Sequence, residues 1–128
     1  MFFKNMYPAL LWAALILALT LSPEPEIPKV KWLNIPQADK IVHAVLFGVQ
    51  YFLLMYGLMR QHSSRVYSKY VLRIIVIVVL YGAVTEILQA VLPTGRDADV
   101  MDWLADCVGT LLAFIIGSFL LKMNKNSA

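Results

Sequence analysis

Charged residues are scarce in this chain, and their scarcity decides its class. Only 15% of the 128 residues are charged, whereas 60% are hydrophobic. A soluble domain of this size could not bury so much apolar surface, so the composition excludes a soluble globular fold. The single cysteine, Cys107, excludes an intramolecular disulfide, and the sequence has no internal repeat. The length allows one domain, residues 1–128.

Long apolar runs make up most of the chain. A helix needs about 17–25 residues to cross the hydrocarbon core of a bilayer. Four runs predict an all-α membrane protein, a bundle of four transmembrane helices: Tyr7 to Leu21, Ile41 to Met59, Val71 to Leu92 and Asp102 to Leu121. The first run also resembles a secretory signal, but no A-x-A-like cleavage site precedes Pro23. We therefore expect it to be retained as the first helix.

The lysines and arginines are unevenly divided between the two sides of these runs. More of them flank the termini and the middle connection than flank the first and third connections, so the positive-inside rule predicts that both termini are cytoplasmic. Basic residues beside helix ends are topology determinants, and we expect no nucleic-acid partner. The first group is Lys4, Arg60, Arg65, Lys69, Arg73, Lys122 and Lys125, and the second is Lys29, Lys31, Lys40 and Arg96.

Glu86 is the most informative residue, because it interrupts the apolar run 71–92. An ionisable group inside a membrane helix costs roughly several kcal/mol unless it is paired or solvated within the protein, which makes it a functional-site candidate. At 1.5 Å per residue, Glu86 lies roughly 10 Å below the outer end of its helix. Gln89 follows three residues later on the same helical face.

Two further polar clusters reach the same membrane face. At the start of the second helix, Asp39 and Lys40 share a face with His43, and an arginine with three aspartates follows the third helix. Because the first and third connections are predicted to face outward, the three clusters can meet in one outward-opening pocket. The predicted ligand-binding residues are Asp39, Lys40, His43, Glu86, Gln89, Arg96, Asp102 and Asp106.

The other features predict packing. The run 7–21 contains no ionisable residue, so we expect it only to support the bundle. Small residues at Gly109, Ala113 and Gly117 recur every four positions and offer a close-packing stripe to a neighbouring helix. That helix could belong to the same chain or to a second copy, so the sequence leaves the oligomeric state open.

Short motifs occur in a fixed order: Asp39-Lys40-x-x-His43, Glu86-x-x-Gln89, Gly95-Arg96, and Asp102 ahead of Ala105-Asp106-x-x-Gly109. In this order, over about residues 36 to 117, they resemble the VanZ-like family of small bacterial membrane proteins. The family commonly has asparagine where this chain has Asp106. The resemblance implies a multi-pass protein of the bacterial cytoplasmic membrane, associated with the cell envelope and named for low-level resistance to the glycopeptide teicoplanin. It implies no particular reaction.

Three functions stay open at this point. In the first, the outward-facing site binds an anionic or lipid-linked headgroup through Lys40 and Arg96, with membrane lipids, lipid-linked envelope precursors or glycopeptides as partners. In the second, His43 and Glu86 act as acid and base on a lipid-linked phosphoryl or acyl bond. The sequence, however, contains no serine-nucleophile motif or recognised lipid-phosphatase signature. In the third, the polar cluster only holds the bundle together, as in an accessory or scaffold protein.

A metal-dependent variant would use histidine and carboxylate ligands. Because these residues lack a metal-binding spacing such as H-E-x-x-H, we predict neither a metal nor another cofactor. Binding is favoured over catalysis. The metal-dependent variant would use His43, Glu86, Asp102 and Asp106.

Overall fold

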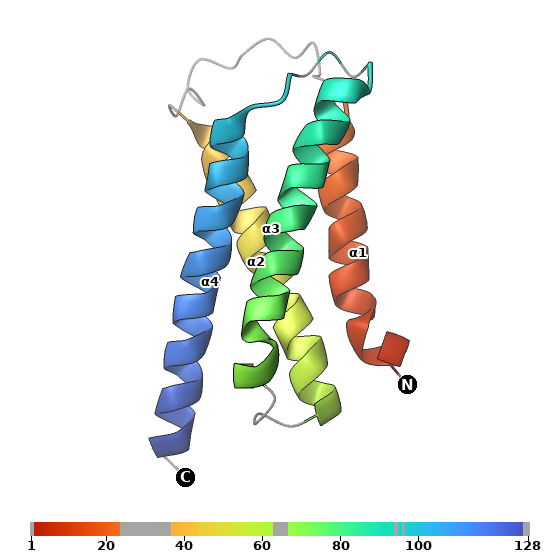
Figure 1. Cartoon of the computed structure of the whole chain (residues 1–128). Coiled ribbons are helices and arrows are strands. Elements are labelled where there is room, and N and C mark those ends of the chain that lie inside the picture. Colours follow the sequence, from red (N-terminus) through yellow and green to blue (C-terminus); the bar gives the residue numbers. More distant parts are fainter. Residues whose placement is uncertain (1, 24–36, 63–66, 94, 96, 127–128) are drawn as a thin grey trace.

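The computed structural model describes residues 2–23, 37–62, 67–93, 95 and 97–126, which form four α-helices and, within those ranges, no strand. Each helix contains a stretch that is long and apolar enough to cross a bilayer. The predicted all-α, four-helix membrane architecture is therefore confirmed. The helices are α1 (Phe2–Leu21), α2 (Ala38–His62), α3 (Tyr67–Val91) and α4 (Val100–Asn126) (Figure 1).

The helices extend beyond the apolar runs that predicted them. α2 runs from Ala38 to His62 around the apolar run 41–59, and α4 continues to Asn126. Apolar residues mark only the part of a helix inside the hydrocarbon, whereas backbone hydrogen bonding continues into the headgroup layer. α3 ends at Val91, because Pro93 disfavours the helical conformation of the residue before it.

Consecutive helices run in opposite directions, so α1 begins and α4 ends at the same end of the bundle (Figure 1). The ends of α1 and α3 and the starts of α2 and α4 lie together at the opposite end, which we call the loop end. A shared side for both termini agrees with the predicted topology. Their cytoplasmic placement stays a prediction from the charge distribution.

α2 is the central helix. Of its spanning segment 50% is buried inside the protein, against 22%, 28% and 22% for α1, α3 and α4. It packs against all three of the other helices, and its Phe47 and Tyr51 are fully buried in a core with Ile16 and Val78. All four helices also carry large exposed apolar side chains, as expected of helices that face lipid.

The small-residue stripe of α4 packs against α2 of the same chain. A Cβ atom on Gly109 would overlap the backbone of Ala44, and one on Gly48 would lie 3.1 Å from the carbonyl oxygen of Gly109 and 3.8 Å from Ala113 Cβ. The predicted close packing is therefore confirmed for Gly109 and Ala113. Because the two backbones approach so closely, the first turns of α4 lie directly against the first turns of α2, and this contact positions the site.

Candidate functional site

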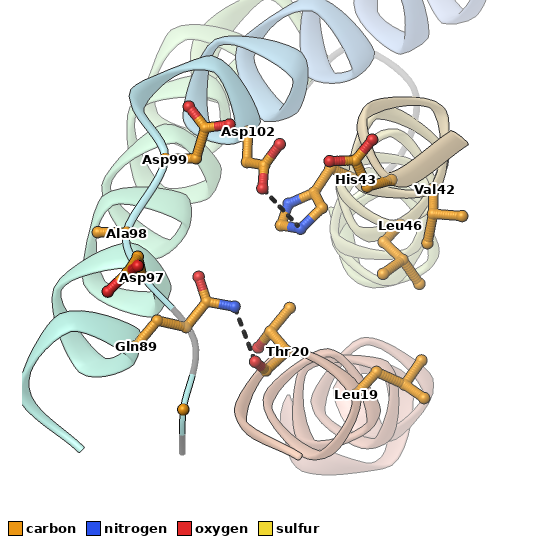
Figure 2. A pocket seen from close by; sticks show the side chains of 12 residues that line it. Leu19, Thr20, Val42, His43, Leu46, Gln89, Asp97, Ala98, Asp99 and Asp102 are labelled. Carbon is orange, nitrogen blue, oxygen red and sulfur yellow. Dashed lines mark hydrogen bonds and ion pairs between the residues drawn. The ribbon is translucent and has the colours of Figure 1, made fainter. Parts of the chain in front are cut away.

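A cavity of about 870 Å³ lies at the loop end (Figure 2). Residues of α1, α2, α3 and α4 line it, together with the connection between α3 and α4. Most of the lining side chains are polar or acidic. The lining residues are Leu19, Thr20, Asp39, Val42, His43, Leu46, Gln89, Gly95, Asp97, Ala98, Asp99 and Asp102.

Lys40, in the first turn of α2, links that helix to α4 and to the connection before it. Its Nζ donates hydrogen bonds to Asp99 Oδ2 and Asp102 Oδ1, both at 3.0 Å, and to Asp39 Oδ2 at 3.4 Å. Three carboxylates thus surround one ammonium group. An anionic ligand at Lys40, which the sequence predicts, would have to compete with these carboxylates.

Asp99 caps the N-terminus of α4. Its Oδ1 accepts a hydrogen bond of 2.8 Å from the backbone N–H of Met101, the arrangement in which a side-chain oxygen satisfies a first-turn donor. This bond and, next to it, the Lys40 ammonium hold the pKa of Asp99 below its usual value of 3.8. The cap explains why α4 begins at Val100, before the apolar run from which it was predicted.

His43 and Asp106 form a buried pair between α2 and α4. His43 Nδ1 lies 2.9 Å from Asp106 Oδ1, and the two residues are 7% and 0% exposed. His43 Nε2 lies 3.9 Å from Asp102 Oδ2, the contact drawn in Figure 2. Because its two nitrogens face two different carboxylates, the imidazole ring is held in one orientation at the wall of the cavity.

Glu86 joins α3 to the connection that precedes α4. Its Oε2 accepts a hydrogen bond of 2.9 Å from the backbone N–H of Asp99, and its side chain is 7% exposed. Its Oε1 has no hydrogen-bond partner within the described ranges, and neither does Asp106 Oδ2. The prediction that the polar clusters of α2, α3 and α4 meet is therefore confirmed. Two buried carboxylate oxygens among these residues lack a hydrogen-bond partner within the described part of the chain.

Two contributors to the site were not predicted from the sequence. α1, expected only to support the bundle, lines the cavity with Leu19 and Thr20, and Gln89 Nε2 donates a hydrogen bond of 2.7 Å to the Thr20 carbonyl oxygen (Figure 2). Gly82 faces Asp106, because a Cβ atom there would lie 2.8 Å from Asp106 Oδ2. The only sequence signal for this contribution of α1 was Thr20, a polar residue one position before the end of the helix.

The remaining residues are Arg96, Asp97 and Cys107. Arg96 lies outside the described residues. Asp97 is exposed and also lines the cavity. Cys107 is a free, half-buried thiol.

The chain matches one protein-family model, described as VanZ/LLP1, over residues 1–121. The chain belongs to the VanZ/LLP1 family. No curated protein and no solved structure matches it. The resemblance found in the motifs is thus confirmed, and the VanZ/LLP1 match also covers α1, which carries none of them.

In this VanZ/LLP1 chain, the motifs that are separated in sequence come together at the loop end. Asp39-Lys40-x-x-His43 opens α2, Glu86-x-x-Gln89 ends α3, and Asp102 and Asp106 begin α4. Lys40 and Asp102, 62 positions apart, are in direct contact. The order of the VanZ-like motifs therefore describes a single three-helix cluster.

The chemistry of this VanZ/LLP1 cluster is that of hydrogen-bond acceptors, one imidazole and one ammonium. Each of three side chains, His43, Glu86 and Asp106, offers one ligand atom, and the three atoms lie within 4.8 Å of one another. These side chains could therefore hold a metal ion. An imidazole oriented by a carboxylate is also the arrangement of a general base. The cavity beside them is large enough for the polar part of a ligand.

Proposed function

We propose that this protein binds the polar headgroup of a lipid or lipid-linked envelope molecule in the loop-end cavity. One observation carries the proposal: a cavity of about 870 Å³, lined by both polar and apolar residues, lies at one end of four membrane-spanning helices. Ligand pockets typically measure about 300–1,000 Å³. At the end of a spanning bundle, a polar cavity is level with lipid headgroups, while the acyl chains can remain beside the apolar outer surface.

The described lining favours a headgroup with hydrogen-bond donors. Asp39, Asp97, Asp99 and Asp102 supply carboxylate oxygens, which accept hydrogen bonds from hydroxyl or amino groups. The Lys40 ammonium is already bonded to carboxylates. The anionic part of the headgroup, a phosphate, is therefore assigned to Arg96, whose guanidinium suits bidentate phosphate contact. A phosphate-linked sugar or amino headgroup would satisfy both requirements.

The charge distribution supports an outward position for the site. If the termini are cytoplasmic, the loop end faces away from the cytoplasm. A headgroup site in the outer leaflet of a bacterial cytoplasmic membrane fits lipid-linked envelope precursors as partners. The glycopeptide resistance for which the VanZ family is named would then follow from binding molecules that carry the envelope building blocks.

A second function, catalysis, is favoured by the His43–Asp106 pair. Asp106 contacts His43 Nδ1. Because His43 lines the cavity, its Nε2 could take a proton from a water molecule. That water would attack a phosphoryl or acyl group of a bound headgroup and break its bond to the leaving oxygen, which would take up the proton from the His43 imidazolium. Conversion of a purified lipid-linked phosphate by the wild type and its loss in His43→Gln would establish this function. Binding of the lipid without its conversion would leave headgroup binding as the function.

Native mass spectrometry of the detergent-purified protein tests the binding proposal. We expect the wild type to retain a lipid adduct that Arg96→Ala loses. Lys122→Ala, which removes an exposed cation near the opposite end of α4, is the matched control and should retain the adduct. Identical adducts in Arg96→Ala and Lys122→Ala would reject a headgroup site at the loop end.

A further inference from the structure

Three side chains with metal-ligand atoms meet beside the cavity, one from each of three helices. His43 of α2, Glu86 of α3 and Asp106 of α4 each offer one ligand atom, and these atoms all lie within 4.8 Å of one another. The three residues are 7%, 7% and 0% exposed. Buried ionisable groups in spanning helices are rare, so a cluster contributed by separate helices calls for a specific counter-charge.

In this cluster, each of the two carboxylates has a hydrogen-bond partner among the described residues for only one of its oxygens. Glu86 Oε2 accepts from the N–H of Asp99, and Asp106 Oδ1 contacts His43 Nδ1. The second oxygen of each carboxylate, Glu86 Oε1 and Asp106 Oδ2, has no hydrogen-bond partner in the described part of the chain. A buried carboxylate oxygen that has lost its water without gaining a partner is costly. The cluster therefore requires a proton or a cation.

The lysine beside the site does not supply that cation. Lys40 pairs with Asp39, Asp99 and Asp102, and no described lysine or arginine forms an ion pair with Glu86 or Asp106. With a neutral imidazole, the two carboxylates leave two negative charges. A divalent cation balances both at once and can take one oxygen of each carboxylate as a ligand.

We infer that His43, Glu86 and Asp106 bind one divalent metal ion of the Zn²⁺ class. Imidazole nitrogen and carboxylate oxygen are Zn²⁺ ligands at about 2.0–2.2 Å, so two neighbouring ligand atoms lie roughly 3–3.5 Å apart. The 2.9 Å between His43 Nδ1 and Asp106 Oδ1 is already close to this spacing. The ligand atom of Glu86 lies within 4.8 Å of the other two and supplies the third ligand.

Three protein ligands leave one position of a tetrahedral Zn²⁺ site open. His43 also lines the cavity, so a water molecule or a ligand oxygen from the cavity can take that position. The metal would place positive charge beside a lining whose described acidic residues otherwise repel a phosphate. This inference stands independently of headgroup binding, because the charge and the partnerless oxygens belong to the protein alone.

Zinc titration of the purified full-length protein tests the inference. The protein is stripped with a chelator in detergent and then titrated with Zn²⁺ alone, and bound metal is counted per chain by elemental analysis after gel filtration. We expect about one Zn²⁺ per wild-type chain. Affinity should fall by at least about tenfold in His43→Gln, Glu86→Gln and Asp106→Asn, each of which removes a ligand or its charge.

Two matched variants separate this site from general binding to acidic groups. Asp39→Asn and Asp97→Asn remove the same charge from exposed carboxylates outside the triad and should keep the wild-type affinity within about twofold. If they weaken binding as much as Asp106→Asn does, the ion binds the cavity carboxylates and the triad assignment is wrong. Wild-type protein that binds far less than one Zn²⁺ per chain also overturns it.

If the triad variants fold poorly, Co²⁺ bound in place of Zn²⁺ to the wild-type protein tests the metal site. Tetrahedral coordination by nitrogen and oxygen ligands gives Co²⁺ visible absorption bands, which wild-type protein should show at about one equivalent and lose when Zn²⁺ is added in excess. Absence of these bands contradicts the inference. Lipid adducts are scored separately in the same samples, so failure of metal binding and failure of headgroup binding are told apart.

Discussion

Lys40 Nζ and Asp102 Oδ1 lie 3.0 Å apart although 62 positions separate them in the chain. This contact joins the first turn of α2 to the first turn of α4, and two further aspartates share the same ammonium group. One lysine thereby holds together the acidic wall of the cavity.

Removing that ammonium should destabilise the loop end. In Lys40→Met, three neighbouring carboxylates lose their shared cation and repel one another. We expect a lower Tm than that of the wild type in thermal unfolding followed by circular dichroism. Lys122→Met replaces an exposed lysine at the far end of α4 and should leave Tm unchanged. Equal Tm values for the two variants would mean that the Lys40 contacts contribute nothing to stability.

The close approach of α2 and α4 should depend on the absence of a side chain at Gly109. A Cβ atom there would overlap the Ala44 backbone, so Gly109→Ala must push the helices apart. Overpacking of this kind costs about 1–3 kcal/mol. Leu112→Ala, at a 52% exposed position of the same helix, is the control and should cost much less. The measurement is the free energy of unfolding in mixed micelles.

Glu86 should order the α3–α4 connection through its bond to the Asp99 N–H. Glu86→Ala removes the acceptor, whereas Glu86→Gln keeps a carbonyl oxygen in reach of the same donor. We expect faster hydrogen exchange at the amide of Asp99 in the alanine variant and near wild-type exchange in the glutamine variant, a difference worth about 1 kcal/mol. Equal protection in both variants would show that Glu86 does not hold this connection.

The depressed pKa of Asp99 predicts a pH-dependent contribution to stability. A carboxyl group whose pKa is lower in the folded than in the unfolded chain stabilises the fold above its unfolded value of 3.8, and this contribution is lost as the pH falls through the lower folded value. The Tm difference between wild type and Asp99→Asn should therefore be present at neutral pH and shrink below pH 3.8. A difference independent of pH would place the origin of the effect elsewhere.

Membrane topology can be tested with single cysteines in a Cys107→Ala background. We expect a membrane-impermeant maleimide to label Asp97→Cys in intact cells, because residue 97 lies in the connection predicted to face outward. Lys122→Cys, at the opposite end of α4, should react only after the cells are opened. The reverse pattern would turn the loop end toward the cytoplasm.

The number of helices and their alternation were predictable because they depend only on apolar length and on charge beside helix ends. The meeting of the clusters around His43, Glu86 and Asp106 followed from the same topology. These features require no knowledge of how the helices pack.

The contacts within the site were not predictable, because they depend on the axial register of α2 against α4. That register is set by the approach of Gly109 to Ala44, which decides that Lys40 meets Asp102 and Asp99. The role of α1 was missed for a related reason. Gln89 binds a backbone carbonyl at Thr20, an acceptor that every residue carries and that no sequence motif marks.

Photo-crosslinking from inside the cavity tests headgroup binding most directly. A diazirine-bearing leucine analogue replaces either Leu19, which lines the cavity, or Leu15, an exposed residue one turn away on the same lipid-facing helix. Both positions should capture bulk membrane lipid, and position 19 should in addition capture one enriched class of phosphate-bearing headgroup, lost in Arg96→Ala. The same lipid distribution at both positions would contradict a headgroup site in this cavity.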